Sequence, residues 1–310
     1  MNGRPLPGDT TGAVVGLDVA AERVRGLVVR ADGRVVLAEE WYTHPERGSH
    51  SVVDTVLDHA ADLVAEAKRA GCPATAVGVA GHGAVDPEAG VVQHATTLGW
   101  HGTPLGPWLA EHVGLPDVAT GDVRAAAVAE SRLGAGRGRE RCAVLSVGTT
   151  LDVTELRSGL PVGSPRCGGP GRRVATHREQ EYEQTRCGCP KTLASAEAFA
   201  AFCAERYEAA ARTCGQYGPG AWLTGSSGRR AVAALADALV PLAGRVDRLV
   251  VGGPAPLMRY ALPGPLGTAL GERLSPGTLP DLVPARMSRP AIALGAALLA
   301  RVRPLPDHAA

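Results

Sequence analysis

The chain has 310 residues, more than one hydrophobic core ordinarily serves, so two lobes are expected. Its net charge of +1 argues against a nucleic-acid surface, which needs a concentrated basic face, so no nucleic-acid partner is expected. No apolar run approaches the ~20 residues of a membrane-spanning helix, and the polar, Pro- and Gly-rich start is not a signal peptide. Seven cysteines, an odd number, favour a reducing, cytoplasmic location over a disulfide framework.

A three-strand meander opens the predicted fold. Residues 13–38 predict three strands, and Asp32-Gly33 between Val-rich runs predicts the hairpin that joins the second strand to the third. The layout is repeated at residues 142–163, which end in a second hairpin at Ser158-Gly159. Strands alternate with helices after each copy, which indicates an α/β architecture of two similar lobes. The other predicted elements are helices at 52–70, 122–133, 194–212 and 230–242 and after Pro290, and strands at 74–80 and 248–251.

The duplication also predicts how the chain is divided. We expect a disordered tail, an N-terminal lobe, a C-terminal lobe, and a closing helix that returns to the N-terminal lobe. In chain order, these parts cover residues 1–11, 12–118, 119–288 and 289–303.

One polar segment of the C-terminal lobe, residues 177–189, has the spacing of a zinc site. His177 precedes Cys187 and Cys189, which supplies one imidazole and two thiolates of the four ligands that tetrahedral zinc prefers. A free cysteine is more often a small buried hydrophobe, and that alternative suits the cysteines in apolar runs. The sequence therefore predicts a structural zinc loop. Its fourth ligand is open between Cys167, water and a distant residue.

Several segments together resemble one family. GVAGHGAVDPEAGVVQHATTLGWHGTPLGPWLAEHVGLP, at 78–116, is similar to the long signature of the ROK family (repressors, open reading frames and sugar kinases). VGTT from Val147, VVGGPAPL from Val250 and the His-to-Cys spacing resemble its second phosphate loop, adenosine loop and zinc motif. The resemblance implies a two-lobed actin-like ATPase (ribonuclease H-like) fold, each lobe a mixed sheet with flanking helices, and a homodimer. The first strand starts near Ala13, so the DNA-reading domain of repressor members is not expected.

For the kinases of this family, the resemblance implies transfer of the ATP γ-phosphoryl group to a sugar or cyclitol hydroxyl, with Mg²⁺ present. Asp122 aligns with the catalytic base, and its alternative role is a helix N-cap. Asp18 aligns with the acidic residue of the first phosphate loop near the metal, and its alternative role is a turn residue. The implied nucleotide and Mg²⁺ positions are Asp18, Gly148, Thr149, Gly252 and Gly253, and the implied substrate positions are Thr97, Gly121, Asp122 and His177.

The sequence departs from the kinase pattern at these loops. The family's Asp-x-Gly-Gly-Thr becomes Asp-Val-Ala-Ala-Glu at residues 18–22, and Asp152 and Pro254 replace glycines in the other two loops. Methyl groups hinder the approach of phosphate to backbone N–H groups, and added carboxylates repel it. Thr97 and Gly121 replace asparagines that contact the sugar.

Three functional interpretations follow. The changes favour a sugar-kinase-like protein that keeps a ligand cleft but has weak or absent ATP-dependent activity. The alternative is an active, divergent kinase for a sugar or cyclitol, which the retained Asp18, Asp122 and His177 favour. A non-kinase enzyme that reuses the cleft is a third interpretation, since a fold does not fix a function.

Overall fold

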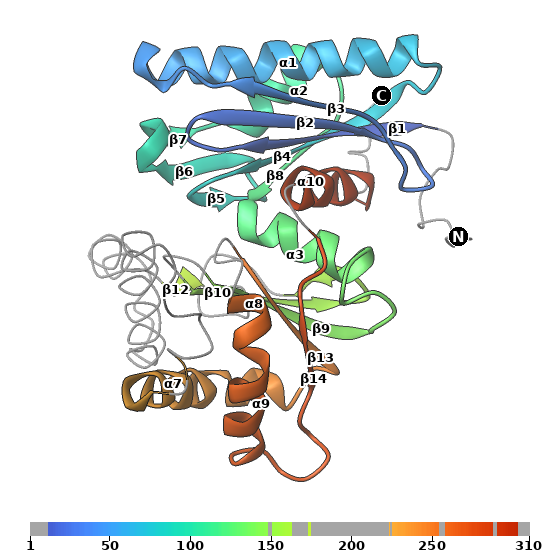
Figure 1. The fold of residues 1–310 in the computed structure, drawn as a ribbon. Coiled ribbons are helices and arrows are strands. Elements are labelled where there is room, and N and C mark those ends of the chain that lie inside the picture. Colours follow the sequence, from blue (N-terminus) through green and yellow to red (C-terminus); the bar gives the residue numbers. More distant parts are fainter. Residues whose placement is uncertain are drawn as a thin grey trace. The chain divides into compact units, whose positions relative to one another are not determined.

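The computed structural model describes residues 12–147, 151–162, 173–174, 223, 225–253, 258–287 and 290–302 (Figure 1). Contacts divide the chain into two compact units, one of residues 1–129 and 288–310 and the other of residues 130–287. The sequence placed this division between residues 118 and 119, whereas the structure places it inside helix α3 (Asp122–Arg132).

The first unit is built on a five-stranded mixed sheet in the order β3-β2-β1-β4-β8. The first three strands form the predicted antiparallel meander, and β4 and β8 are parallel to β1. Gly33 closes the predicted hairpin with a φ of 82°, a conformation that glycine adopts without steric cost. The strands are β1 (Ala13–Val19), β2 (Arg23–Val29), β3 (Val35–Tyr42), β4 (Ala74–Gly81) and β8 (Asp117–Gly121).

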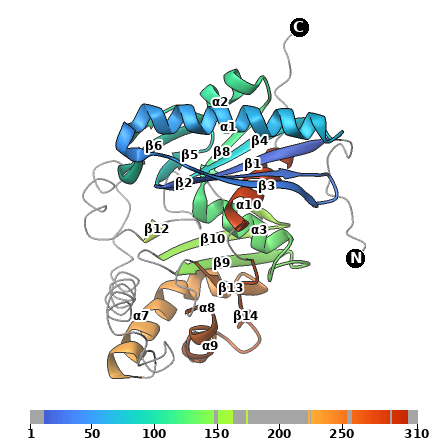
Figure 2. The same ribbon diagram turned by 45° about the horizontal axis from the view of Figure 1, so that its top comes forward.

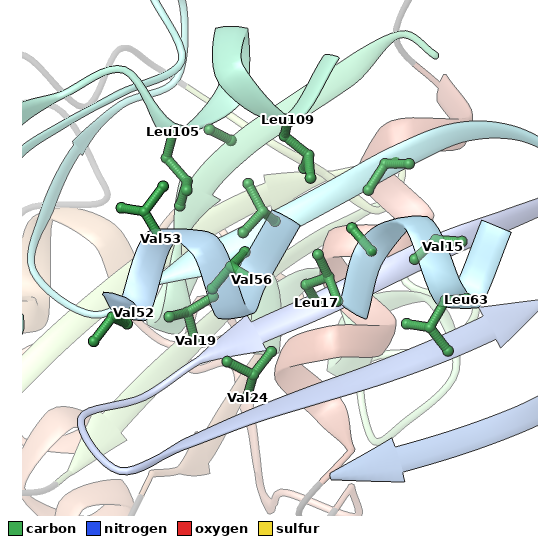
Figure 3. Packing of buried hydrophobic residues seen from close by; sticks show 14 of the residues in the cluster. Val15, Leu17, Val19, Val24, Val52, Val53, Val56, Leu63, Leu105 and Leu109 are labelled. Carbon is green, nitrogen blue, oxygen red and sulfur yellow. The ribbon is translucent and has the colours of Figure 1, made fainter. Parts of the chain in front are cut away.

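Helices α1 (Ser49–Arg69) and α2 (Leu105–Val113) cover one face of this sheet (Figure 2). Successive side chains of a strand point to opposite faces, so alternate residues of β1 enter this core. Figure 3 shows Leu17 among the valines that α1 directs at the sheet. The labelled cluster comprises Val15, Leu17, Val19, Val24, Val52, Val53, Val56, Leu63, Leu105 and Leu109.

Helix α10 (Ala291–Val302) packs on the opposite face, against β1 and β4. Glycines allow this close approach. A Cβ atom at Gly16 would lie 2.0 Å from the carbonyl oxygen of Ala293, and one at Gly78 would lie 2.1 Å from that of Ala296. Because Gly16 and Gly78 are register partners, they lie side by side and leave a surface without side chains on which α10 packs.

A small three-stranded antiparallel sheet, β5-β6-β7, belongs to the same unit and was not predicted from the sequence. Trp100, on its last strand, is 1% exposed and donates its indole N–H to the carbonyl of Ser49 at 3.1 Å. This bond ties the small sheet to the start of α1. Its elements are β5 (Ala84–Asp86), β6 (Val91–Ala95), the 3-10 helix η2 (Thr96–Leu98) and β7 (Trp100–Thr103); a second short helix, η1, spans Pro45–Arg47.

The second unit repeats the strand order of the first, β11-β10-β9-β13-β14. Its first three strands form an antiparallel meander and the last two are parallel to β9, which confirms the predicted duplication. The predicted turn at 148–150 and helix at 194–212 lie outside the described residues. The elements are β9 (Arg141–Val147), β10 (Leu151–Arg157), β11 (Leu160–Pro161), β12 (Arg173–Val174), α7 (Ser226–Ala243), β13 (Arg248–Gly252), α8 (Met258–Ala261), α9 (Pro263–Gly271) and β14 (Asp281–Pro284).

A buried carboxylate joins the first and last residues of the second unit. Glu130 is 4% exposed and accepts hydrogen bonds from the backbone N–H groups of Ala135 and Met287.

Within the described ranges, no helix has the length and hydropathy needed to cross a membrane.

Candidate functional site

Three polar side chains lie at the carboxyl ends of neighbouring parallel strands in the first unit. Asp18 is the penultimate residue of β1, His82 directly follows β4, and Asp122 directly follows β8. The order β1-β4-β8 brings these three ends to one edge of the sheet. In open α/β sheets, ligands bind at this edge. The two candidate acids, Asp18 and Asp122, therefore share one site with a histidine.

Asp122 and His82 form a hydrogen-bonded pair. Imidazole Nδ1 of His82 lies 3.0 Å from Oδ2 of Asp122, while Oδ1 of Asp122 accepts the backbone N–H of Val123 at 2.8 Å. An N-cap side chain instead accepts from the second or third residue after it, so capping does not account for this arrangement. The side chains of His82 and Asp122 are 46% and 22% exposed. The pair is thus held by hydrogen bonds within the protein, with His82 exposed and Asp122 partly exposed.

His82 was not identified from the sequence. It stands in the signature at 78–116, directly after the strand predicted at 74–80, just as Asp122 follows its own strand. The available signal was therefore positional: a side chain able to transfer protons at the carboxyl end of a predicted parallel strand.

Asp18 is buried and paired with a cation. Its side chain lies within β1, not in the turn that the sequence offered as an alternative, and it is 3% exposed. Nη1 of Arg25, on β2, is 3.4 Å from its Oδ2. Burial raises the pKa of Asp18 to about 6, the Arg25 charge opposes that rise, and the negative charge of Asp122 adds to it. Burial therefore outweighs the guanidinium.

The loop after β1, where the family has its first phosphate loop, is a closed hairpin turn. The N–H of Ala20 donates to the carbonyl of Arg23 at 2.9 Å. Thr43, fully buried, donates its hydroxyl to the carbonyl of Ala21 at 2.7 Å and its N–H to the carbonyl of Glu22 at 3.0 Å. The Ala20 N–H is thus engaged within the protein rather than directed at a ligand.

The resemblance implies Mg²⁺ near Asp18, and the residues there do not fit it. Mg²⁺ demands oxygen ligands in near-ideal octahedral geometry, is usually bound through one or two carboxylates, and keeps several of its waters. Asp18 is nearly inaccessible and already faces a guanidinium. Across the described part of the chain, no group of three His, Cys, Asp or Glu side chains is arranged to hold a metal.

The predicted zinc ligands His177, Cys187 and Cys189 lie outside the described residues, so the zinc loop stays a prediction. Cys72 and Cys142 are buried free thiols, as expected of cysteines in apolar runs.

The remaining predicted positions fall on both units. In the second unit, Gly252 ends β13, and Gly253 has a φ of 104° with its Cα beside the backbone of Val147. A Cβ at Gly253 would lie 2.4 Å from the nitrogen of Val147, so only glycine fits there. Gly148 and Thr149 lie outside the described residues.

In the first unit, Thr97 is exposed in η2, and Gly121 is the last residue of β8. A Cβ at Gly121 would meet nothing within 4 Å, so space is available directly before Asp122.

Two units with the same strand order, each a mixed sheet flanked by helices, define an α/β protein of the actin-like ATPase fold. The sequence profile of the ROK family matches residues 14–303. The chain belongs to the ROK family.

Glucokinases are among the known relatives of this chain. A glucokinase of Streptomyces coelicolor is 28% identical over 140 residues, which is 45% of this chain and 42% of that protein. The chain spans 41% to 61% of the length of the curated relatives it matches.

Two solved structures show the same fold. A Streptomyces griseus ROK glucokinase in complex with glucose and AMPPNP has a TM-score of 0.60 and 22% identity, covering 94% of this chain and 99% of that one. A ROK transcriptional regulator homologous to Escherichia coli MLC has a TM-score of 0.68 and 16% identity, covering 93% and 78%.

Proposed function

We propose that this protein binds a sugar or cyclitol-like ligand at the edge formed by Asp122 and His82, and that it transfers phosphate from ATP weakly or not at all. The observation that supports this most is the contrast between the two acids of the site. Asp122 is oriented by His82 and partly exposed, whereas Asp18 is buried against Arg25.

The Asp122 edge suits a polyol. A carboxylate accepts hydrogen bonds from hydroxyl groups, and each oxygen of Asp122 has capacity beyond the one contact described above. The solved glucokinase of Streptomyces griseus contains glucose, which makes a hexose the first ligand to test. The open space at Gly121 lies next to this carboxylate.

The nucleotide loops argue against ordinary ATP binding. Ala20 uses its N–H within the hairpin, and Glu22 adds a carboxylate in the same turn. Like charges at ~4 Å repel by ~1 kcal/mol in water and by several times that at the lower effective dielectric of a protein. In the second unit, Asp152 replaces a glycine of the family's second phosphate loop and is 4% exposed on β10.

An active, divergent kinase is the alternative, and the placement of Asp122 favours it. The residue keeps the family position of the base, at the strand end where a hydroxyl nucleophile would be held. In that case, loops other than the family's would have to hold the nucleotide.

Titration calorimetry with D-glucose, D-mannose and myo-inositol, and separately with Mg-ATP and Mg-ADP, tests the proposal. We expect a polyol to bind the wild type, and Asp122→Asn to weaken it at least ~10-fold, the usual effect of losing a charged hydrogen bond. Asp54→Asn, on an exposed position of α1, is the matched control and should change nothing.

Nucleotide should bind weakly or not at all in the same titrations. Micromolar Mg-ATP affinity together with turnover on the hexoses would establish the kinase alternative instead. Equal polyol affinity of the wild type and Asp122→Asn would remove Asp122 from the site.

The zinc loop is a separate proposal, with His177, Cys187 and Cys189 as ligands. Protein purified without added zinc should contain about one equivalent, as one tetrahedral site requires. Metal near zero, with the melting temperature of Cys187→Ala equal to that of the wild type, would contradict it. We further propose a homodimer in the cytoplasm, and light scattering coupled to size-exclusion chromatography tests the dimer.

A further inference from the structure

The ion pair between Asp18 and Arg25 follows directly from the sheet register. The two residues are cross-strand partners in the antiparallel β1–β2 pair, so their side chains leave the sheet on the same face. Oδ2 of Asp18 lies 3.4 Å from Nη1 of Arg25, and the two side chains are 4% and 25% exposed. A short hairpin fixes this register, so Arg25 is placed opposite Asp18 by the backbone.

Arg25 is also anchored from its other side. Its Nε donates to the carboxylate of Glu40, the register partner of Arg25 on β3. Glu40 also accepts a hydrogen bond from Arg23. These bonds from Arg23 and Arg25 hold the pKa of Glu40 below its usual value, so the anchor is an anion at neutral pH. The guanidinium of Arg25 is therefore held across three strands rather than mobile on the surface.

We infer that Arg25 is a built-in cation that replaces a divalent metal at Asp18, and that this edge of the sheet works without such a metal. A metal ion at Asp18 would compete with Arg25 for one carboxylate and would be repelled by its fixed positive charge. Arginine keeps its charge at every physiological pH, so this counter-ion is permanent.

A further reason is space. Mg²⁺ retains an octahedral shell of waters and carboxylates, and while Arg25 is in place an Asp18 side chain with 4% exposure offers no volume for that shell. The guanidinium needs no such shell, since it is weakly hydrated and donates in a plane. The inference concerns the metal alone, so it holds whether or not a polyol binds at Asp122.

Binding of Mn²⁺, counted by electron paramagnetic resonance of the free ion, tests this without an activity assay. The comparison uses the wild type, Asp18→Asn, Arg25→Gln, Arg25→Lys and the double variant Asp18→Asn/Arg25→Gln. Wild type and Asp18→Asn should bind the same number of ions, because Asp18 holds none. Arg25→Gln should gain one site with affinity at least ~10-fold above the wild type, which the double variant should lose.

Arg25→Lys keeps the charge and should remain without the extra site. The inference is overturned if the wild type binds one more Mn²⁺ than Asp18→Asn, a comparison that stands even if Arg25→Gln does not fold. It is also overturned if folded Arg25→Gln gains no site that depends on Asp18.

Discussion

Gly78→Val is expected to lower the free energy of unfolding by at least ~3 kcal/mol, the upper part of the range for overpacked interiors. A Cβ at Gly78 would lie 2.1 Å from the carbonyl oxygen of Ala296 and 2.5 Å from its carbon. Both are backbone atoms of α10, so no side-chain rotation relieves the clash. The helix must move away from β4 as a whole. It also contacts β1 through Gly16, so the loss extends across that face of the sheet.

The size of this effect matters because native proteins are stable by only ~5–15 kcal/mol. Gly121→Val is the matched control, since Gly121 ends the neighbouring strand β8 and a Cβ there meets nothing within 4 Å. Urea unfolding followed by tryptophan fluorescence gives both values. If the two substitutions lower the free energy of unfolding equally, α10 does not pack closely on Gly78.

The meander and its repetition could be predicted because their signals are local. Val-rich alternation and the Asp32-Gly33 turn act over a few residues, and both hairpins form as expected, with Ser158 and Gly159 at positive φ. The small sheet β5-β6-β7 was missed because its strands are short, and β5 has only three residues. The α10 packing was missed for a different reason. Gly16 and Gly78 are far from α10 in the chain, and their role in close packing exists only when the helix and the sheet meet.

The residues of the candidate site also divide into those that could be predicted from the sequence and those that could not. Asp122 at the start of a helix could be predicted from its neighbours in the sequence, and the structure places it there. The pairing of Asp122 with His82 could not, because β4 and β8 become neighbours only through tertiary pairing. Arg25 is an intermediate case, because its position could be predicted from the sequence only in part. Once the turn between β1 and β2 is known, the hairpin register alone puts it opposite Asp18.

Asp18→Asn should stabilise the protein relative to the wild type at neutral pH, and this advantage should vanish in acid. Burial raises the pKa of Asp18 from 3.8 to about 6, so the folded state holds this proton more tightly than the unfolded state. The stability that Asp18 contributes is therefore fully present below about pH 4 and is lost as the pH rises through about 6. A shift of about two units corresponds to ~3 kcal/mol.

Urea unfolding of wild type and variant at pH 4, 5, 6 and 7 gives the difference directly. The asparagine has the shape of the protonated acid, so the two proteins should be nearly equally stable at pH 4, and the variant should lead by up to ~3 kcal/mol at pH 7. The free energy of unfolding of Asp54→Asn, a change on the exposed face of α1, should vary with pH as that of the wild type does. A lead for the wild type that grows with pH would mean that Arg25 outweighs burial. Asp18 would then be a strongly ionised acid whose charge is balanced by Arg25.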